Sequence, residues 1–151
     1  MTISHKQPVS VLVVIHTAAL DVLLLERAAH PGFWQSVTGS REDGESLIGT
    51  ARREVREETG IDTADGVLED WQRVNTFEIF AEWRHRYAPG VTHNAEHVFS
   101  LQLASRPSIS ISPSEHRDWQ WLPWQDAALR CFSWTNRDAI LMLGKRGASG
   151  T

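Results

Sequence analysis

Residues 39–61 read GSREDGESLIGTARREVREETGI, and the rest of the chain is organised around this stretch. A helix over Ser46 to Thr59 would place Glu54, Glu57 and Glu58 at positions i, i+3 and i+4, so that their carboxylates share one narrow face. Like charges at this spacing repel each other, and apolar side chains of the same helix lie beside them. Oxygen ligands on one rigid element suit Mg2+ or Mn2+, whereas the simpler alternative is a solvated acidic face paired with nearby arginines.

The spacing of the residues around this acidic face follows the pattern G-x5-E-x7-R-E-U-x-E-E-x-G-U, in which U is aliphatic. The matching positions are Gly39, Glu45, Arg53, Glu54, Val55, Glu57, Glu58, Gly60 and Ile61. This 23-residue pattern is the Nudix box, and the chain resembles the Nudix hydrolase family. The resemblance implies an α/β fold of the α+β type, with a mixed β-sheet sandwiched between helices. It also implies metal-dependent hydrolysis of a diphosphate linked to another group.

The resemblance assigns roles within the box. It implies that Glu54 and Glu58 bind the metal directly, and that Glu57 is a further ligand or holds metal-bound water. The backbone carbonyl of Gly39 would complete the coordination. Arg53 would orient the acidic cluster, as groups behind the ligands of a metal site commonly do.

A carboxylate outside the box is also expected at the metal site, as a distant ligand or a general base. The sequence offers Glu96 and Glu115, and the resemblance favours Glu115, which comes just before the last predicted strand. An exposed loop acid is the alternative interpretation of Glu115. The neighbouring His116 is expected to be a surface residue, since a lone histidine is more often that than a catalyst. The predicted catalytic residues are Glu57, Glu58, Arg53 and Glu115.

Four further segments of the sequence indicate which group of Nudix hydrolases the chain resembles. The segments FWQSVTGS (33–40), FEIF (77–80), RHRYAPGVT (84–92) and SWTNR (133–137) resemble the bacterial dihydroneopterin triphosphate diphosphatases, which are folate-pathway Nudix hydrolases. This resemblance implies conversion of dihydroneopterin triphosphate to the monophosphate and pyrophosphate. The substrate-binding residues that it implies are Lys6, Arg27, Thr38, Phe77, Glu78, Ile79, Phe80 and Ser133. The aromatic residues among them could equally belong to the core.

Two other functions are compatible with the sequence. A nucleotide-pool hydrolase acting on dATP, dGTP or oxidised purine nucleotides would use the same box, because pterin and guanine share a pyrimidinone edge. A Nudix-fold binding module would recognise a phosphorylated ligand without cleaving it. The intact acidic positions of the box disfavour the binding module.

Composition limits the remaining possibilities. A formal net charge of −4 and a pI near 5.9 disfavour a nucleic-acid partner, which would need a broad basic surface. The apolar run at residues 9–15 is too short to span a membrane. The single cysteine, Cys131, excludes an internal disulfide and fits a reducing compartment. We therefore expect a cytoplasmic protein made of one Nudix hydrolase domain, residues 1–151, that binds a small pterin or purine triphosphate.

The order of the expected elements suits one mixed sheet between helical layers. The β-branched apolar run at residues 8–16 predicts a strand that is buried on both faces. The other expected strands are residues 22–26, 33–40, 67–83, 96–103 and 119–122. Helices are expected at residues 46–59, 124–132 and 136–145, with a basic hairpin connection at 84–91.

Overall fold

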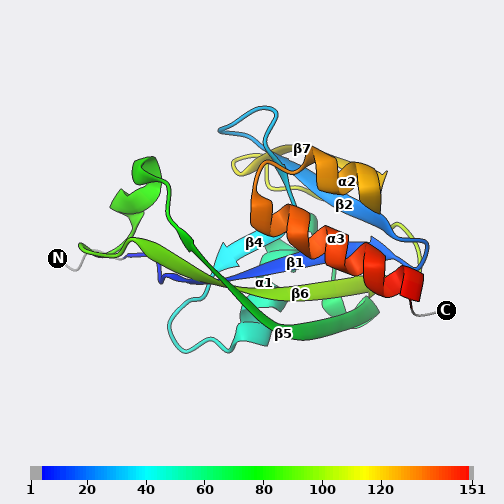
Figure 1. Ribbon diagram of the computed structural model, residues 1–151, viewed down its shortest axis with the longest axis horizontal. Coiled ribbons are helices and arrows are strands. Elements are labelled where there is room, and N and C mark those ends of the chain that lie inside the picture. Colours follow the sequence, from blue (N-terminus) through cyan, green and yellow to red (C-terminus); the bar gives the residue numbers. More distant parts are fainter. Residues whose placement is uncertain (1–4, 150–151) are drawn as a thin grey trace.

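The computed structural model describes residues 5–149 and shows helices on both sides of a β-sheet (Figure 1). The strands are β1 (Val9–Thr17), β2 (Asp21–Arg27), β3 (Trp34–Gln35), β4 (Val37–Ser40), β5 (Gly66–Glu78), β6 (His93–Leu103) and β7 (His116–Pro123). The α-helices are α1 (Leu47–Thr59), α2 (Trp124–Arg130) and α3 (Trp134–Ser149), and the 3-10 helices are η1 (Thr63–Asp65) and η2 (Ala81–Arg86).

The seven strands form one mixed sheet. The strand order is β3-β2-β1-β6-β5, while β4 also pairs with β1 and β7 also pairs with β2. The pairing of β1 with β6 is parallel and extends from Val9 opposite Ala95 to Thr17 opposite Leu103. The other strand pairs are antiparallel. The expected mixed sheet between helices is thereby confirmed.

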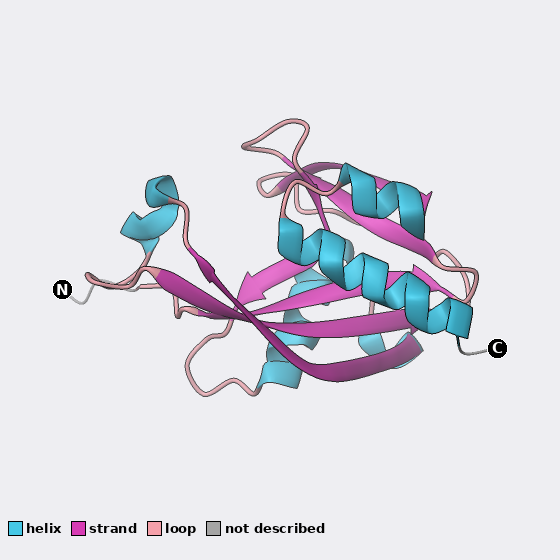
Figure 2. Cartoon of the chain, in the orientation of Figure 1, coloured by secondary structure: helices cyan, strands magenta, loops and turns pink. Residues whose placement is uncertain are grey.

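Strand β1 lies at the centre of the sheet and is buried along almost its whole length. Side chains alternate along a strand, so β1 contributes to two cores. On one face, Val11, Val13 and Ile15 pack with Ala51 and Val55 of α1. On the other face, Leu12 and Val14 pack with Ala127 and Ala128 of α2 and with Ala139, Ile140 and Leu143 of α3. Figure 2 shows α1 behind the sheet and α2 and α3 in front of it.

Helix α1 has clear signals at both ends. The Ser46 side chain accepts a hydrogen bond from the Gly49 N–H, which satisfies one of the free donors of the first turn. Gly60 follows the last turn with a φ of 77°, a left-handed conformation that glycine adopts without steric cost. The helix predicted from the box is therefore confirmed, with Ser46 as its N-cap.

One predicted strand is too long. The strand expected over residues 67–83 ends at Glu78, and residues 81–86 form η2, so the predicted basic hairpin contains a helical turn. Glu78 pairs with His93, the first residue of β6, so the chain beyond Glu78 has no strand to extend. It closes instead on itself, with the Trp83 N–H donating to the Phe80 carbonyl. In Figure 1, η2 lies at the end of the sheet where β1 begins.

Candidate active site

The acidic face of α1 has two buried carboxylates and one exposed carboxylate. Glu54 and Glu58 are 8% and 2% exposed, whereas Glu57 is exposed. Burial raises the pKa of Glu54, and it raises the pKa of Glu58 well above its ordinary value, with the adjoining Glu54 as the next cause. The three glutamates were predicted to share one face of the helix. In the structure, Glu54 and Glu58 form a close buried pair, and Glu57 lies at the edge that faces solvent.

Glu115, just before β7, and His116, the first residue of β7, lie next to Glu58. One ligand atom from each of Glu58, Glu115 and His116 lies within 4.8 Å of the others. The His116 Nε2 lies 3.6 Å from Oε1 of Glu58. Among residues 5–149, neither carboxyl oxygen of Glu58 has a hydrogen-bond partner. Such buried, unpaired carboxylate oxygens fit a hard divalent cation, which would neutralise them.

His116 is part of this site although the sequence predicted a surface residue. It is only 3% exposed, and burial, followed by the positive charge of Arg27, lowers its pKa to about 4. The imidazole is therefore neutral near pH 7 and can act as a hydrogen-bonding group or a ligand. Glu115 is exposed and His116 is buried, as expected for neighbouring residues at the start of a strand, but this difference is known only from the fold.

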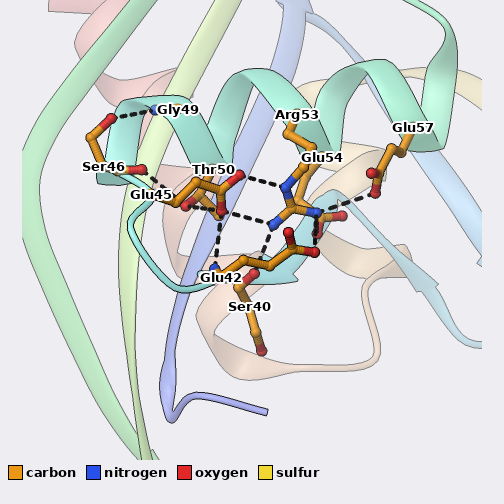
Figure 3. Close-up of polar contacts among 9 residues, drawn as sticks. All are labelled: Ser40, Glu42, Glu45, Ser46, Gly49, Thr50, Arg53, Glu54 and Glu57. Carbon is orange, nitrogen blue, oxygen red and sulfur yellow. Dashed lines mark hydrogen bonds and ion pairs between the residues drawn. The ribbon is translucent and has the colours of Figure 1, made fainter. Parts of the chain in front are cut away.

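Arg53 donates hydrogen bonds to acidic residues of the box (Figure 3), which is compatible with the orienting role predicted for it. Its Nε donates to Glu45 at 2.6 Å, its Nη1 donates to Glu54 at 2.8 Å and to Glu57 at 3.3 Å, and its Nη2 donates to the Ser40 carbonyl at 3.0 Å. The hydrogen bond from Arg53 lowers the pKa of Glu45 to about 2. The planar guanidinium thus links the loop before α1 to both ligand-bearing turns of the helix.

Gly39 lies directly beneath the Glu54 side chain. A β-carbon at this position would overlap the Glu54 carboxyl group. Gly39 is therefore required by the close approach of a side chain, and its position on β4 places its backbone beside the acidic cluster.

A cleft of about 1230 Å3 joins the acidic cluster to the other predicted residues. Every residue predicted to bind metal or substrate contributes to its wall. The predicted substrate-binding residues on the wall are Lys6, Arg27, Thr38, Phe77, Glu78, Ile79, Phe80 and Ser133. Their roles stay predictions, but the structure brings them together in one cleft. Of this set, Ile79 is mostly buried and Phe80 is half exposed.

Three cations line the cleft near the carboxylates. Burial lowers the pKa of Lys6 and of Arg27, and Arg86 lowers both further, which shows that the three charges lie close to one another. None of the three forms an ion pair with an acidic side chain of residues 5–149. The Lys6 N–H donates to the Arg86 carbonyl, which holds η2 to the start of the chain. Clustered cations of this kind suit a polyphosphate, whereas the sequence placed Arg86 only in a basic hairpin connection.

Aromatic side chains connect the loops around the cleft. The Arg27 guanidinium lies 4.8 Å from the centre of the Trp83 ring, and His30 contacts Trp83 at 5.8 Å. Phe33 stacks on Phe132 with ring centres 4.7 Å apart. These contacts join η2, the loop before β3 and the loop before α3, and so fix the outer wall of the cleft.

The two candidates for the distant carboxylate lie in different places. Glu115 belongs to the cluster with Glu58, whereas Glu96 does not. Glu96 lies on β6, on the same sheet face as Val98, which packs under α2 and α3. Burial raises the pKa of Glu96 to about 7, although the Thr135 side chain opposes this increase. Of the two candidates, therefore, only Glu115 lies beside Glu58. Glu96 lies on the other face of the sheet, under α2 and α3.

Proteins of similar sequence and fold are known. The sequence pattern of the NUDIX domain matches residues 6–143, and the chain belongs to the Nudix family. The dihydroneopterin triphosphate diphosphatase of Escherichia coli strain K12 is 48% identical over 139 residues, which cover 90% of this chain and 91% of that protein. The Haemophilus influenzae protein of the same name is 38% identical over 143 residues, which cover 93% and 89% of the two chains.

A solved structure supports the same relationship. The structure of the E. coli dihydroneopterin triphosphate pyrophosphohydrolase superposes with a TM-score of 0.85 and 48% sequence identity. The alignment covers 91% of this chain and 95% of that chain. Within residues 5–149, no helix is long and apolar enough to cross a membrane.

Proposed function

We propose that this protein is a metal-dependent hydrolase that converts dihydroneopterin triphosphate and water to dihydroneopterin monophosphate and pyrophosphate. The observation that carries the proposal is one cleft that contains both the buried carboxylates and the three cations. The 48% identity to an E. coli protein named for this substrate supports it. A cytoplasmic place in folate synthesis is part of the same proposal.

Glu54, Glu58 and Glu115 are the residues that would hold the metal ion, for which we propose Mg2+, with Mn2+ as a substitute. The unpaired oxygens of Glu58 support a central position for it in this ligand set, and the Gly39 carbonyl and Glu57, which line the same cleft, would complete the coordination. When bound, the ion would neutralise phosphate charge and lower the pKa of a water molecule. Arg53 would keep the carboxylates in place, and the exposed carboxylate of Glu115 could accept a proton from the attacking water.

The remaining cleft residues would bind the two ends of the substrate. Lys6, Arg27 and Arg86 would receive the triphosphate, since they are close to the carboxylates and have no acidic partner among the described residues. Thr38, Ser133 and the 77–80 segment line the part of the cleft that would receive the ring system. The substrate would thus lie with its phosphate groups at the metal site and its ring system toward the start of α3.

The test is a comparison of kcat/KM with Mg2+ on dihydroneopterin triphosphate and on the standard deoxynucleoside triphosphates, with detection of pyrophosphate. Preference for the pterin by tenfold or more supports the proposal. A preference for nucleotides would replace it with a nucleotide-pool function, and no hydrolysis of any of them would favour a binding module.

A further inference from the structure

Two hydrogen-bond acceptors are buried in the floor of the cleft without partners. They are Oε1 of Glu96 and Oδ1 of Asn94, and each residue is only 4% exposed. Neither atom has a hydrogen-bond partner among residues 5–149, although the Thr135 side chain lies close enough to the Glu96 carboxyl group to oppose the rise in its pKa. Buried acceptors in folded proteins are normally paired, because an unpaired one loses its hydrogen bonds to water without compensation. The arrangement therefore suits a ligand that brings hydrogen-bond donors.

The two acceptors lie side by side and are held in place. Asn94 and Glu96 are two residues apart on β6, so their side chains point to the same face of the sheet. The Asn94 Nδ2 donates to Oγ of Ser10 at 2.7 Å, which fixes the amide plane and leaves its oxygen available. Ser10 lies directly opposite Glu96 on β1. Both acceptors also line the cleft that contains the catalytic candidates.

This polar floor is separate from the metal site. The acceptors share their sheet face with Val98 and Leu12, which pack against α2 and α3, whereas Glu54 and Glu58 come from α1 on the opposite face. Residues of both places line the same cleft. A ligand whose phosphates lie at the metal site would therefore present its ring system to the floor.

We propose that Glu96, assisted by Asn94, is the specificity-determining residue that binds the 2-amino-4-oxopyrimidine edge of the substrate ring. This inference rests on the proposed function, and it adds the groups that select the ring. Pterins and guanine have a ring N–H beside an exocyclic amino group, and these two donors match the two unpaired acceptors, Oε1 of Glu96 and Oδ1 of Asn94. Adenine has an unprotonated nitrogen at the equivalent ring position, so an acceptor would face an acceptor. The floor would therefore select the pterin or guanine pattern over adenine.

The test is the substrate preference of Glu96→Gln. Its amide retains one acceptor but turns a donor toward the ligand's donors. We expect kcat/KM to fall about 10- to 100-fold for dihydroneopterin triphosphate and for dGTP, and to stay within about threefold for dATP. The matched control is Glu69→Gln on the neighbouring strand β5, where the side chain is exposed and lies outside the cleft. In this control variant, the ratios of kcat/KM among dihydroneopterin triphosphate, dGTP and dATP should equal those of the wild type.

A binding measurement separates recognition from chemistry. Neopterin has the same ring edge and no phosphate, so its affinity, followed by tryptophan fluorescence without metal, should fall at least tenfold in Glu96→Gln and stay constant in Glu69→Gln. Equal losses on all three triphosphates, or no loss on any of them, would overturn the assignment of Glu96 even if the wild-type enzyme prefers the pterin. If the wild type fails on the pterin, the proposed function fails, and the ratio of dGTP to dATP still decides the role of Glu96.

Discussion

The carboxyl group of Glu54 lies against the backbone of Gly39, so closely that a β-carbon at position 39 would overlap it. The first residue of the box and its central glutamate are thus in direct contact across β4 and α1. This contact accounts for glycine at position 39, because β4 can approach α1 this closely only where no side chain intervenes.

Gly39→Ala tests this contact. The added methyl group must displace the Glu54 carboxylate, so we expect kcat to fall at least about 100-fold and the free energy of unfolding to decrease by about 1–3 kcal/mol. Steady-state kinetics and urea denaturation measure the two effects. In the comparison variant Gly49→Ala, the new β-carbon would lie 2.9 Å from Oγ of the N-cap Ser46, so stability should fall while kcat stays near that of the wild type. Full activity of Gly39→Ala would contradict the predicted role of Glu54.

Glu58→Gln tests the metal site. Removing the buried carboxylate should lower kcat by several orders of magnitude and abolish the increase in Tm that Mg2+ or Mn2+ produces in the wild type. The fold should survive, because a neutral amide is easier to bury than a charged carboxylate. Metal-dependent stabilisation equal to that of the wild type would show that the ion binds elsewhere.

Glu115→Gln and Glu96→Gln separate the two candidates for the distant carboxylate. Glu115 belongs to the cluster with Glu58, so Glu115→Gln should lower kcat by at least about 100-fold on every substrate. Glu96→Gln should change substrate preference while the kcat on dATP stays near that of the wild type. Parallel kcat and KM measurements on the two variants decide between them, and the reverse pattern would exchange their roles.

Glu96 should also make stability depend on pH. Burial raises its pKa from 4.5 to about 7, so the folded state holds this proton more tightly than the unfolded state does. Its contribution to the free energy of unfolding is therefore largest below pH 4.5 and is lost as the pH rises to about 7, by about 3 kcal/mol in total. Urea denaturation from pH 5 to pH 8 should show wild-type stability falling relative to Glu96→Gln. A constant difference would mean that the carboxylate is already ionised at pH 5.

The sequence predicted the parts of the fold that local pattern determines. The box helix has an N-cap serine and a closing glycine at its ends, and the β-branched run of β1 is buried on both faces as expected. The end of β5 was not predictable, because it depends on where the partner strand β6 begins. The strand with which β5 pairs is determined by the tertiary structure, and the sequence near Glu78 does not show where that strand begins.

In the site, too, the features that depend on local sequence were predictable and those that depend on tertiary structure were not. The spacing of the box identified the acidic face, and the resemblance identified residues that the structure places around one cleft. The burial of His116 and Glu96 depends on helices and strands distant in sequence, so their environments appear only in the folded protein. Arg86 was recognised as part of a basic cluster, but its closeness to Lys6 depends on the position of η2.

The most direct test of the whole account is kcat/KM with Mg2+ on freshly prepared dihydroneopterin triphosphate, measured beside dATP and dGTP with detection of released pyrophosphate. We expect pyrophosphate as the product and a preference for the pterin of at least about tenfold, which corresponds to about 1.4 kcal/mol of discrimination in the transition state. Faster hydrolysis of either deoxynucleotide, or release of inorganic phosphate in place of pyrophosphate, would contradict it.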